Sequence, residues 1–157
     1  MKTFVFLIMS LLVFWGCIRE PEDSNQNEIG LISSTYNGCL KSISADDTPV
    51  ESYLISALGD QNYRIDHLNA SFNCCLPEGI AFGITQKNDT LFITDYEKVP
   101  GNCRCMCVYN TEAIFNNLED GNYILCLSTG EKKVGSVEIY FDETLNTEID
   151  ISELSEY

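Results

Sequence analysis

Two groups of cysteines constrain this chain more than any other feature of its sequence. The stretch "NCC" covers residues 73–75, and "CRCMC" at 103–107 places a cysteine on every second position. On an extended strand the outer two of this triplet point the same way and lie about 13 Å apart. Because a disulfide needs Cα atoms within about 6.8 Å and converging side chains, the outer two do not pair with each other while extended. A direct bridge between neighbouring members of the triplet would need a kink in the strand.

The simplest pairing therefore joins members of the triplet to the "CC" pair across neighbouring strands, with the more distant cysteines taking other members. A bond between Cys74 and Cys75 themselves would form a strained ring. The sequence leaves the connectivity open, and the disulfide candidates are Cys39, Cys74, Cys75, Cys103, Cys105, Cys107 and Cys126. Seven is an odd number, so at least one of these thiols is free, capped or paired with another molecule.

A metal site is the alternative interpretation of the same residues. Tetrahedral zinc holds its sulfur ligands less than about 4 Å apart, and three alternate cysteines on a strand do not converge that far. A site would combine one Cys-x-Cys pair with the "CC" pair, giving the thiolate set Cys74, Cys75, Cys103 and Cys105, which suits zinc or cuprous copper. Paired Cys-x-x-Cys spacing is absent, so structural disulfides are the favoured interpretation and no cofactor is expected. Thiol exchange is less favoured still, because exchange sites usually lie at a helix N-terminus and this triplet has a strand pattern.

The start of the chain indicates export. Lys2 precedes an apolar run from Phe4 to Trp15, which as a helix would rise only about 18 Å, too short to span a bilayer core. The run ends at Gly16-Cys17 and resembles a bacterial lipoprotein signal, in which Cys17 becomes the lipidated first residue of the mature chain. We therefore expect a signal peptide at 1–16, a flexible tether at 17–30 and one domain at 31–157. This signal predicts a protein that is lipid-anchored to the outer membrane, and the acidic residues soon after Cys17 add the hypothesis that it is exposed at the cell surface.

The rest of the chain alternates between apolar and polar residues, as half-buried strands do. In "NYRIDHLNASFNCC" the parity of the apolar positions switches near Asp66-His67, which predicts a β-bulge. The segment "IAFGITQKNDTLFITDY" predicts a hairpin that turns at 87–89, and 137–141 predicts a further strand. Residues 48–58 carry both helical capping signals and a strand-like apolar run, and strand is slightly favoured.

The stretch "LEDGNYILCL" bears on the type of β fold. Leu118, Gly121 and Tyr123 resemble the connection between the E and F strands of immunoglobulin-like domains, where a tyrosine hydroxyl bonds to backbone. The cysteine that follows this tyrosine in antibodies is here displaced by one residue to Cys126. We therefore predict an all-β, immunoglobulin-like antiparallel β-sandwich that is disulfide-bonded but lacks the usual bridge between its sheets.

Catalysis and nucleic-acid binding are both disfavoured. The net charge of −15 argues against nucleic acid and against electrostatic docking on anionic lipid. No hydrolase or nucleotide-binding motif is present. The single histidine, His67, is expected to be a partly buried structural residue, because its neighbour Asp66 would face the other way on a strand.

The combination of "HLNASFNCC", "CRCMC" and "LEDGNYIL" resembles a group of small uncharacterised lipoproteins from gut and oral anaerobic bacteria. The resemblance implies an envelope location and this fold, but no reaction. The tripeptide "DTL" at 89–91 also resembles an O-glycosylation motif of such bacteria, which makes Thr90 a candidate glycan site. The sequence thus predicts a non-enzymatic, lipid-anchored interaction or structural accessory module, whose protein or glycan partner is unknown. The alternative is a thiolate metal-binding lipoprotein.

Overall fold

The computed structural model describes residues 28–42 and 50–155. Within these ranges the chain forms strands joined by turns, followed by one 3₁₀ turn, η1 (Ile151–Glu153). No helix in the described part of the chain is long and apolar enough to cross a membrane. The signal peptide, Cys17 and most of the tether expected from the sequence lie outside the described residues.

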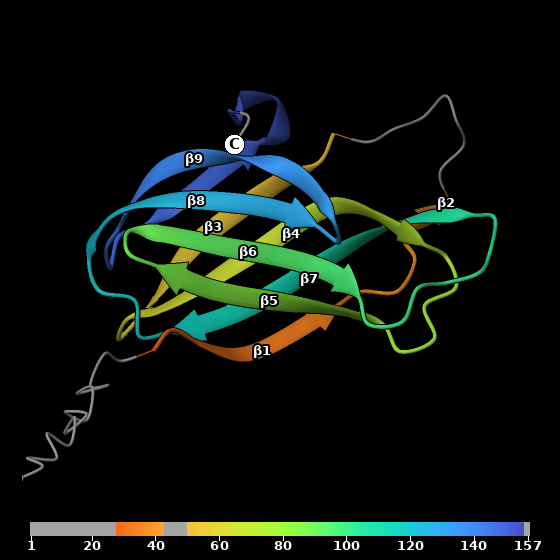
Figure 1. The fold of residues 1–157 in the computed structure, drawn as a ribbon, viewed down its shortest axis with the longest axis horizontal. Helices are drawn as coiled ribbons and strands as arrows, with labels where there is room; N and C mark the ends of the chain where they lie inside the picture. Colours follow the sequence, from red (N-terminus) through yellow and green to blue (C-terminus); the bar gives the residue numbers. More distant parts are fainter. Residues whose placement is uncertain (1–27, 43–49, 156–157) are drawn as a thin grey trace, which may run out of the picture.

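The strands form two sheets that lie one in front of the other (Figure 1). Sheet A has the order β1-β7-β4-β3-β10, with β2 also paired to β7, and sheet B has the order β5-β6-β8-β9. The strands of sheet A are β1 (Gly30–Tyr36), β2 (Lys41–Ser42), β3 (Ser52–Gly59), β4 (Asn62–Asn73), β7 (Met106–Asn116) and β10 (Asn146–Asp150). The strands of sheet B are β5 (Ile80–Lys87), β6 (Thr90–Glu97), β8 (Gly121–Thr129) and β9 (Lys132–Phe141).

The predicted all-β architecture with two facing sheets is confirmed, but one pairing differs from the expected antiparallel pattern. Strands β6 and β8 are parallel, because the chain leaves β6, passes through β7 in the other sheet and returns to β8. In the immunoglobulin arrangement both sheets are antiparallel. The antiparallel expectation is therefore wrong for the pairing of β6 with β8, whereas β5 with β6 and β8 with β9 are antiparallel.

The main core lies between the two sheets. Its largest fully buried side chains come from alternate positions of strands on both sides, including Tyr53, Tyr63 and Phe115 from sheet A and Leu125 and Phe141 from sheet B. Alternation places one face of each strand in the core and the other toward solvent. Burial of these side chains stabilises the fold by about 1.5–3 kcal/mol for each fully buried apolar residue.

The hairpin expected from "QKNDTL" is present. Strands β5 and β6 pair from Ile80 with Glu97 to Lys87 with Thr90, which leaves Asn88 and Asp89 as the turn. Asn88 has a φ of 54°, a left-handed conformation that asparagine tolerates better than most residues. The disputed segment at 48–58 forms a strand from Ser52 onward, so the slightly favoured alternative is the correct one there.

The predicted bulge in β4 is also present and divides the core into two parts. The pairing of β4 with β7 shifts register between His67 and Ala70, and Asn69 between them has a φ of 58°. Before the bulge, the odd-numbered side chains of β4 enter the main core, whereas Ala70 and Phe72 after it enter a second, smaller core. The far end of β4 therefore turns its apolar side chains toward Ile80 and Tyr109, and it is this end that carries the cysteines.

Candidate functional site

Three disulfides gather at the end of the molecule where β4 finishes and β7 begins. They join Cys74 to Cys105, Cys75 to Cys103 and Cys39 to Cys107, with Cα–Cα distances of 5.6, 5.7 and 5.5 Å. These separations lie in the usual range for a disulfide. We call the four cysteines of the first two bridges, Cys74, Cys75, Cys103 and Cys105, the cysteine cluster.

The triplet does not form one extended strand, contrary to the expectation from its spacing. Strand β7 begins at Met106, so Cys107 is on the strand while Cys103 and Cys105 lie in the loop before it. Pro100 lacks a backbone N–H and Gly101 follows it, which favours a loop over a ladder-forming strand here. Because the loop curves back over the end of β4, both of its cysteines reach the "CC" pair.

The third bridge ties the N-terminal segment to the same end. Strand β2 pairs with the start of β7, with Lys41 opposite Val108 and Ser42 opposite Cys107. This pairing holds Cys39 beside β7, where it bonds to the buried Cys107. The bridge closes a loop between residues 68 positions apart in the sequence.

Asn73 organises the cysteine cluster through its backbone and its side chain. Its side-chain oxygen accepts a hydrogen bond from the backbone N–H of Cys75 at 2.9 Å, and its side-chain amide donates to the carbonyl of Cys103 at 2.8 Å. The Asn73 carbonyl also accepts a hydrogen bond from the hydroxyl of Tyr109 at 3.1 Å. One asparagine thus positions both residues of the Cys75–Cys103 bridge.

Glu97, at the end of β6, fastens the same region to sheet B. Its two carboxylate oxygens accept the backbone N–H groups of Asn73 and Gly101, each at 2.8 Å. Charge-assisted hydrogen bonds of this kind are about twice as strong as neutral ones. The loop that carries Cys103 is therefore held to both sheets without the help of a disulfide.

Gly101 permits the close approach of this loop to β4. A Cβ atom at Gly101 would lie under 3.0 Å from the Cys75 carbonyl oxygen and from the Asn73 side chain. The first of these is backbone, which cannot rotate away. The roles of Asn73, Glu97 and Gly101 were not predicted from the sequence, although the asparagine of "NCC" and the Pro-Gly pair before the triplet are signals that could have indicated two of them.

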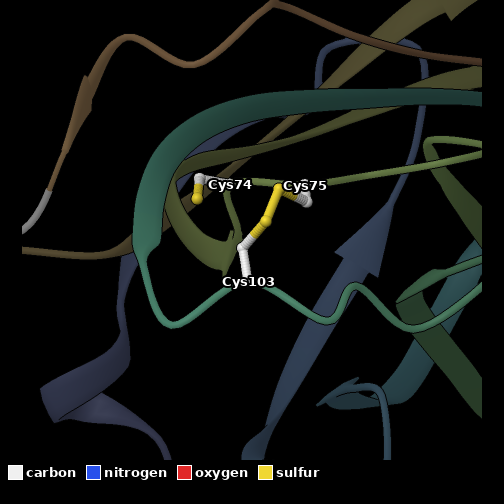
Figure 2. A group of neighbouring side chains, drawn as sticks. All are labelled: Cys74, Cys75 and Cys103. Carbon is white, nitrogen blue, oxygen red and sulfur yellow. A yellow bond between two sulfur atoms is a disulfide. The ribbon is translucent and has the colours of Figure 1, made fainter.

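The sulfurs of three of these cysteines lie close together. The Sγ atoms of Cys74, Cys75 and Cys103 are all within 4.8 Å of one another. Figure 2 shows the bonded sulfurs of Cys75 and Cys103 with the Cys74 side chain beside them. All three side chains are partly exposed, so two neighbouring disulfides are within reach of solvent and of each other.

Neither family models, nor curated proteins, nor solved structures gave a match to this chain.

Cys126 lies apart from the cysteine cluster. It is the free cysteine among the described residues and is buried, on the sheet B strand β8. Burial raises the pKa of the Cys126 thiol, so it is a poor nucleophile at neutral pH. Cys126 was a candidate for a disulfide but forms none, because the cysteines of the "NCC" and "CRCMC" groups pair with one another and with Cys39.

His67 occupies a separate buried polar site at the bulge. Its ring is fully buried, with Nδ1 2.7 Å from Oδ2 of Asp95 and Nε2 3.7 Å from Oε2 of Glu51. Tyr53 stacks on the ring at a centroid distance of 4.1 Å. Burial alone lowers the pKa of His67, but the carboxylates of Asp95 and Glu51 more than offset this, and the pKa is raised overall.

His67 was expected to be partly buried, but its ring is fully buried. Its partner Asp95 was not predicted, because this residue is 28 positions away on the other sheet. The remaining candidate, Thr90, is partly exposed at the first position of β6, beside the turn of the hairpin.

Proposed function

We propose that this chain is an exported, lipid-anchored domain of the cell envelope that acts as a non-catalytic interaction or structural module. The observation that carries the proposal is the pairing of six cysteines into three disulfides at one end of the fold. Disulfides of this density are formed and kept in oxidising compartments outside the cytosol. The lipoprotein-like signal that ends at Cys17 accounts for export and attachment.

The burial of the reactive side chains supports a non-catalytic role. The ring of His67, the only histidine of the sequence, is fully buried in its ion pair, and the thiol of Cys126 is buried as well. A general base must come within hydrogen-bond reach of its substrate, and neither side chain does so in this arrangement. The oxidised cysteines of the three bridges are not nucleophiles.

The outer face of sheet B is the surface that best suits a partner. Phe92, Tyr96, Ile124 and Tyr140 are 38, 39, 43 and 54 % exposed. Their positions alternate with core residues on β6, β8 and β9, so they share the solvent-facing side of the sheet. Aromatic residues on a rigid sheet supply much of the binding energy at protein interfaces, and they also stack on sugar rings.

An immunoglobulin-like relationship is part of this proposal. It is supported by Tyr123, whose hydroxyl donates a 3.1 Å hydrogen bond to the carbonyl of Glu119 at the crossing from β7 to β8. This is the tyrosine arrangement expected at such a corner. The parallel pairing of β6 and β8 is a departure from that family's topology, so we propose a variant of it. The likeness to small lipoproteins of anaerobic bacteria remains part of the same proposal.

Attachment and export are tested in cells that produce the full chain. Metabolic labelling with a palmitate analogue should mark the wild-type protein and should leave the Cys17→Ser variant unlabelled and released from the membrane fraction. Protease treatment of intact cells then reports on surface exposure. Unlabelled wild-type protein in the cytosolic fraction would contradict the proposal.

The interaction role is tested by site-specific photo-crosslinking in the same cells. A photoreactive residue at position 140 is expected to give a defined adduct, identified by mass spectrometry as protein or glycan. The matched control is position 58, where Leu58 is 49 % exposed on sheet A, compared with 54 % for Tyr140. If the two positions crosslinked equally, or if neither crosslinked, the outer face of sheet B would not be the binding surface.

A further inference from the structure

We propose that the cysteine cluster, once its two bridges are reduced, is a pre-formed thiolate site for a soft metal cation such as Zn²⁺ or Cu⁺. The inference goes beyond the proposed function and does not depend on it. It starts from the three sulfurs of Cys74, Cys75 and Cys103, which lie within 4.8 Å of one another. The fourth sulfur, that of Cys105, is bonded to Cys74 and so lies beside them.

The distances are close to those that a metal requires. Tetrahedral zinc with Zn–S bonds of about 2.3 Å holds its sulfurs just under 4 Å apart. The sulfur of Cys74 lies within 4.8 Å of the other two and must approach them slightly. The sulfurs of Cys75 and Cys103, bonded to each other in the oxidised protein, must separate once reduced. Each of these movements is about 1 Å per sulfur, which side-chain rotation supplies. Cys105 is exposed and lies in the loop just before the start of β7, so its side chain has room to rotate inward once its bridge is open.

The backbone around the cluster is held in place without disulfides. Asn73 bonds to the backbone of Cys75 and Cys103, and Cys74 donates its backbone N–H to the carbonyl of Cys105 at 3.2 Å. Glu97 holds the backbone of Asn73 and Gly101 from sheet B. Reduction removes the sulfur–sulfur bonds but none of these hydrogen bonds, so the four thiols remain gathered.

The donor set selects the type of cation. Both carboxylate oxygens of Glu97, a neighbouring acid, already accept backbone hydrogen bonds, which leaves sulfur as the ligand type in the cluster. Thiolates favour zinc and cuprous copper, whereas calcium and magnesium require oxygen ligands. The net charge of −15 also attracts cations to the protein surface.

The reaction balances with a dithiol or phosphine reductant. Each bridge takes up two electrons and two protons and becomes two thiols; a dithiol reductant leaves as its own disulfide, and a phosphine leaves as its oxide with oxygen from water. Binding of the cation then releases protons from the thiols that become thiolate ligands. The oxidised cluster has no thiolate to offer, so the site exists only in the reduced state.

The test uses the purified full chain, reduced with a phosphine under nitrogen and then freed of reductant. Titration with Zn²⁺ alone should give one ion per chain, and Co²⁺ in its place should show the intense sulfur-to-metal absorption of a thiolate site. The oxidised chain should bind neither ion. Far-ultraviolet circular dichroism of the reduced chain should retain its β-sheet spectrum.

Variants identify the ligands. Cys75→Ser and Cys103→Ser are each expected to weaken binding at least tenfold, and Asn73→Ala, which removes the positioning hydrogen bonds, should weaken it about 10–100-fold. The matched control is the double variant C39S/C107S, which removes two thiols that lie outside the cluster and should bind as the reduced wild type does.

Failure of this inference is distinguishable from failure of the proposed function. If the reduced chain binds no ion, unfolds, or binds equally well in the Cys75→Ser and Cys103→Ser variants, the metal site is overturned. None of these results affects the bridges of the oxidised, exported protein. Stoichiometric binding that these two variants abolish and C39S/C107S leaves intact would establish the site.

Discussion

His67 on β4 and Asp95 on β6 join the two sheets through a fully buried contact of 2.7 Å between Nδ1 and Oδ2. The groups that face the ring come from several elements. Glu51 precedes β3, Tyr53 stacks on the ring from β3, and Thr111 on β7 donates a hydrogen bond to the same Asp95 oxygen at 3.4 Å. The bulge of β4 begins at this histidine, so the polar contact lies where the two parts of the core meet.

Replacing His67 by Gln should destabilise the fold strongly. It leaves the buried Asp95 carboxylate without its charged partner, which costs about 3–5 kcal/mol in comparable cases. Urea unfolding of the oxidised chain, followed by far-ultraviolet circular dichroism, measures the decrease in the free energy of unfolding. The double variant H67Q/D95N should regain part of it, because two amides can pair without a buried charge.

The matched control for this pair is Asp66→Asn. Asp66 is the neighbour of His67 and forms an ion pair with Arg64 at 3.1 Å, but both side chains reach solvent. Exposed pairs contribute about 0–1 kcal/mol. If Asp66→Asn lowered the free energy of unfolding as much as His67→Gln does, the buried contact would contribute no more to stability than the exposed ion pair.

Stability should fall as the pH rises above neutrality. The pKa of His67 is raised in the folded state, so the folded protein holds its proton more tightly than the unfolded chain does. The resulting stabilisation is complete below the unfolded pKa of about 6.5 and is lost as the pH rises through the raised value. Unfolding free energies measured from pH 6 upward should decline in the wild type and lack this component in His67→Gln. Parallel curves for the two proteins would rule out this role of the histidine.

Substitution of Gly101 by Ala should disturb the cysteine cluster. The added Cβ would meet the Cys75 carbonyl under 3.0 Å away, so the loop must shift and the Cys75–Cys103 bridge with it. We expect a loss of about 1–3 kcal/mol, as for other overpacked sites, together with mispaired disulfides after oxidative refolding. Peptide mapping of the refolded protein measures the mispairing.

Gly38→Ala is the control for that substitution. Gly38 lies next to Cys39, near another bridge, but a Cβ there would meet nothing within 4 Å. It should refold with native pairing and unchanged stability. If Gly38→Ala mispaired as often as Gly101→Ala, close packing at Gly101 would not be the cause.

Removal of the bridge between Cys39 and Cys107 should destabilise the oxidised protein, because this bridge closes a long loop and the stabilisation grows with the logarithm of loop length. For a separation of 68 residues, the chain-entropy estimate is about 4 kcal/mol. Differential scanning calorimetry of C39A/C107A without reductant measures this change. Cys126→Ala, which removes a buried thiol that closes no loop, should cost much less, and an equal loss would contradict the assignment of Cys126 as unbridged.

The parts of the fold that depend on neighbouring residues could be predicted from the sequence. Alternation identified the strands, the change of parity near His67 indicated the bulge, and the polar residues 87–89 indicated the hairpin turn to within one residue. The Tyr123 hydrogen bond to Glu119 also spans only a few residues. Each of these signals is local, because a strand or a turn is specified by residues next to one another.

The features that depend on distant residues could not be predicted. The parallel pairing of β6 with β8 depends on where β7 crosses to the other sheet. The curved path of the loop at Cys103 and Cys105 depends on Glu97 and Asn73, which reach it from two different strands. Alternate spacing alone suggested an extended strand there, because spacing carries no information about hydrogen bonds from distant residues that hold a segment in a curved loop.

The most direct test of the central claim is the disulfide map of the full chain, isolated without reductant from the cells that make it. Thiols are blocked during lysis, and peptides are identified by mass spectrometry. The account predicts bridges between Cys39 and Cys107, Cys74 and Cys105, and Cys75 and Cys103, with Cys126 recovered as a blocked thiol after unfolding. Recovery of all the cysteines of these bridges as blocked thiols would contradict an exported, disulfide-bonded domain.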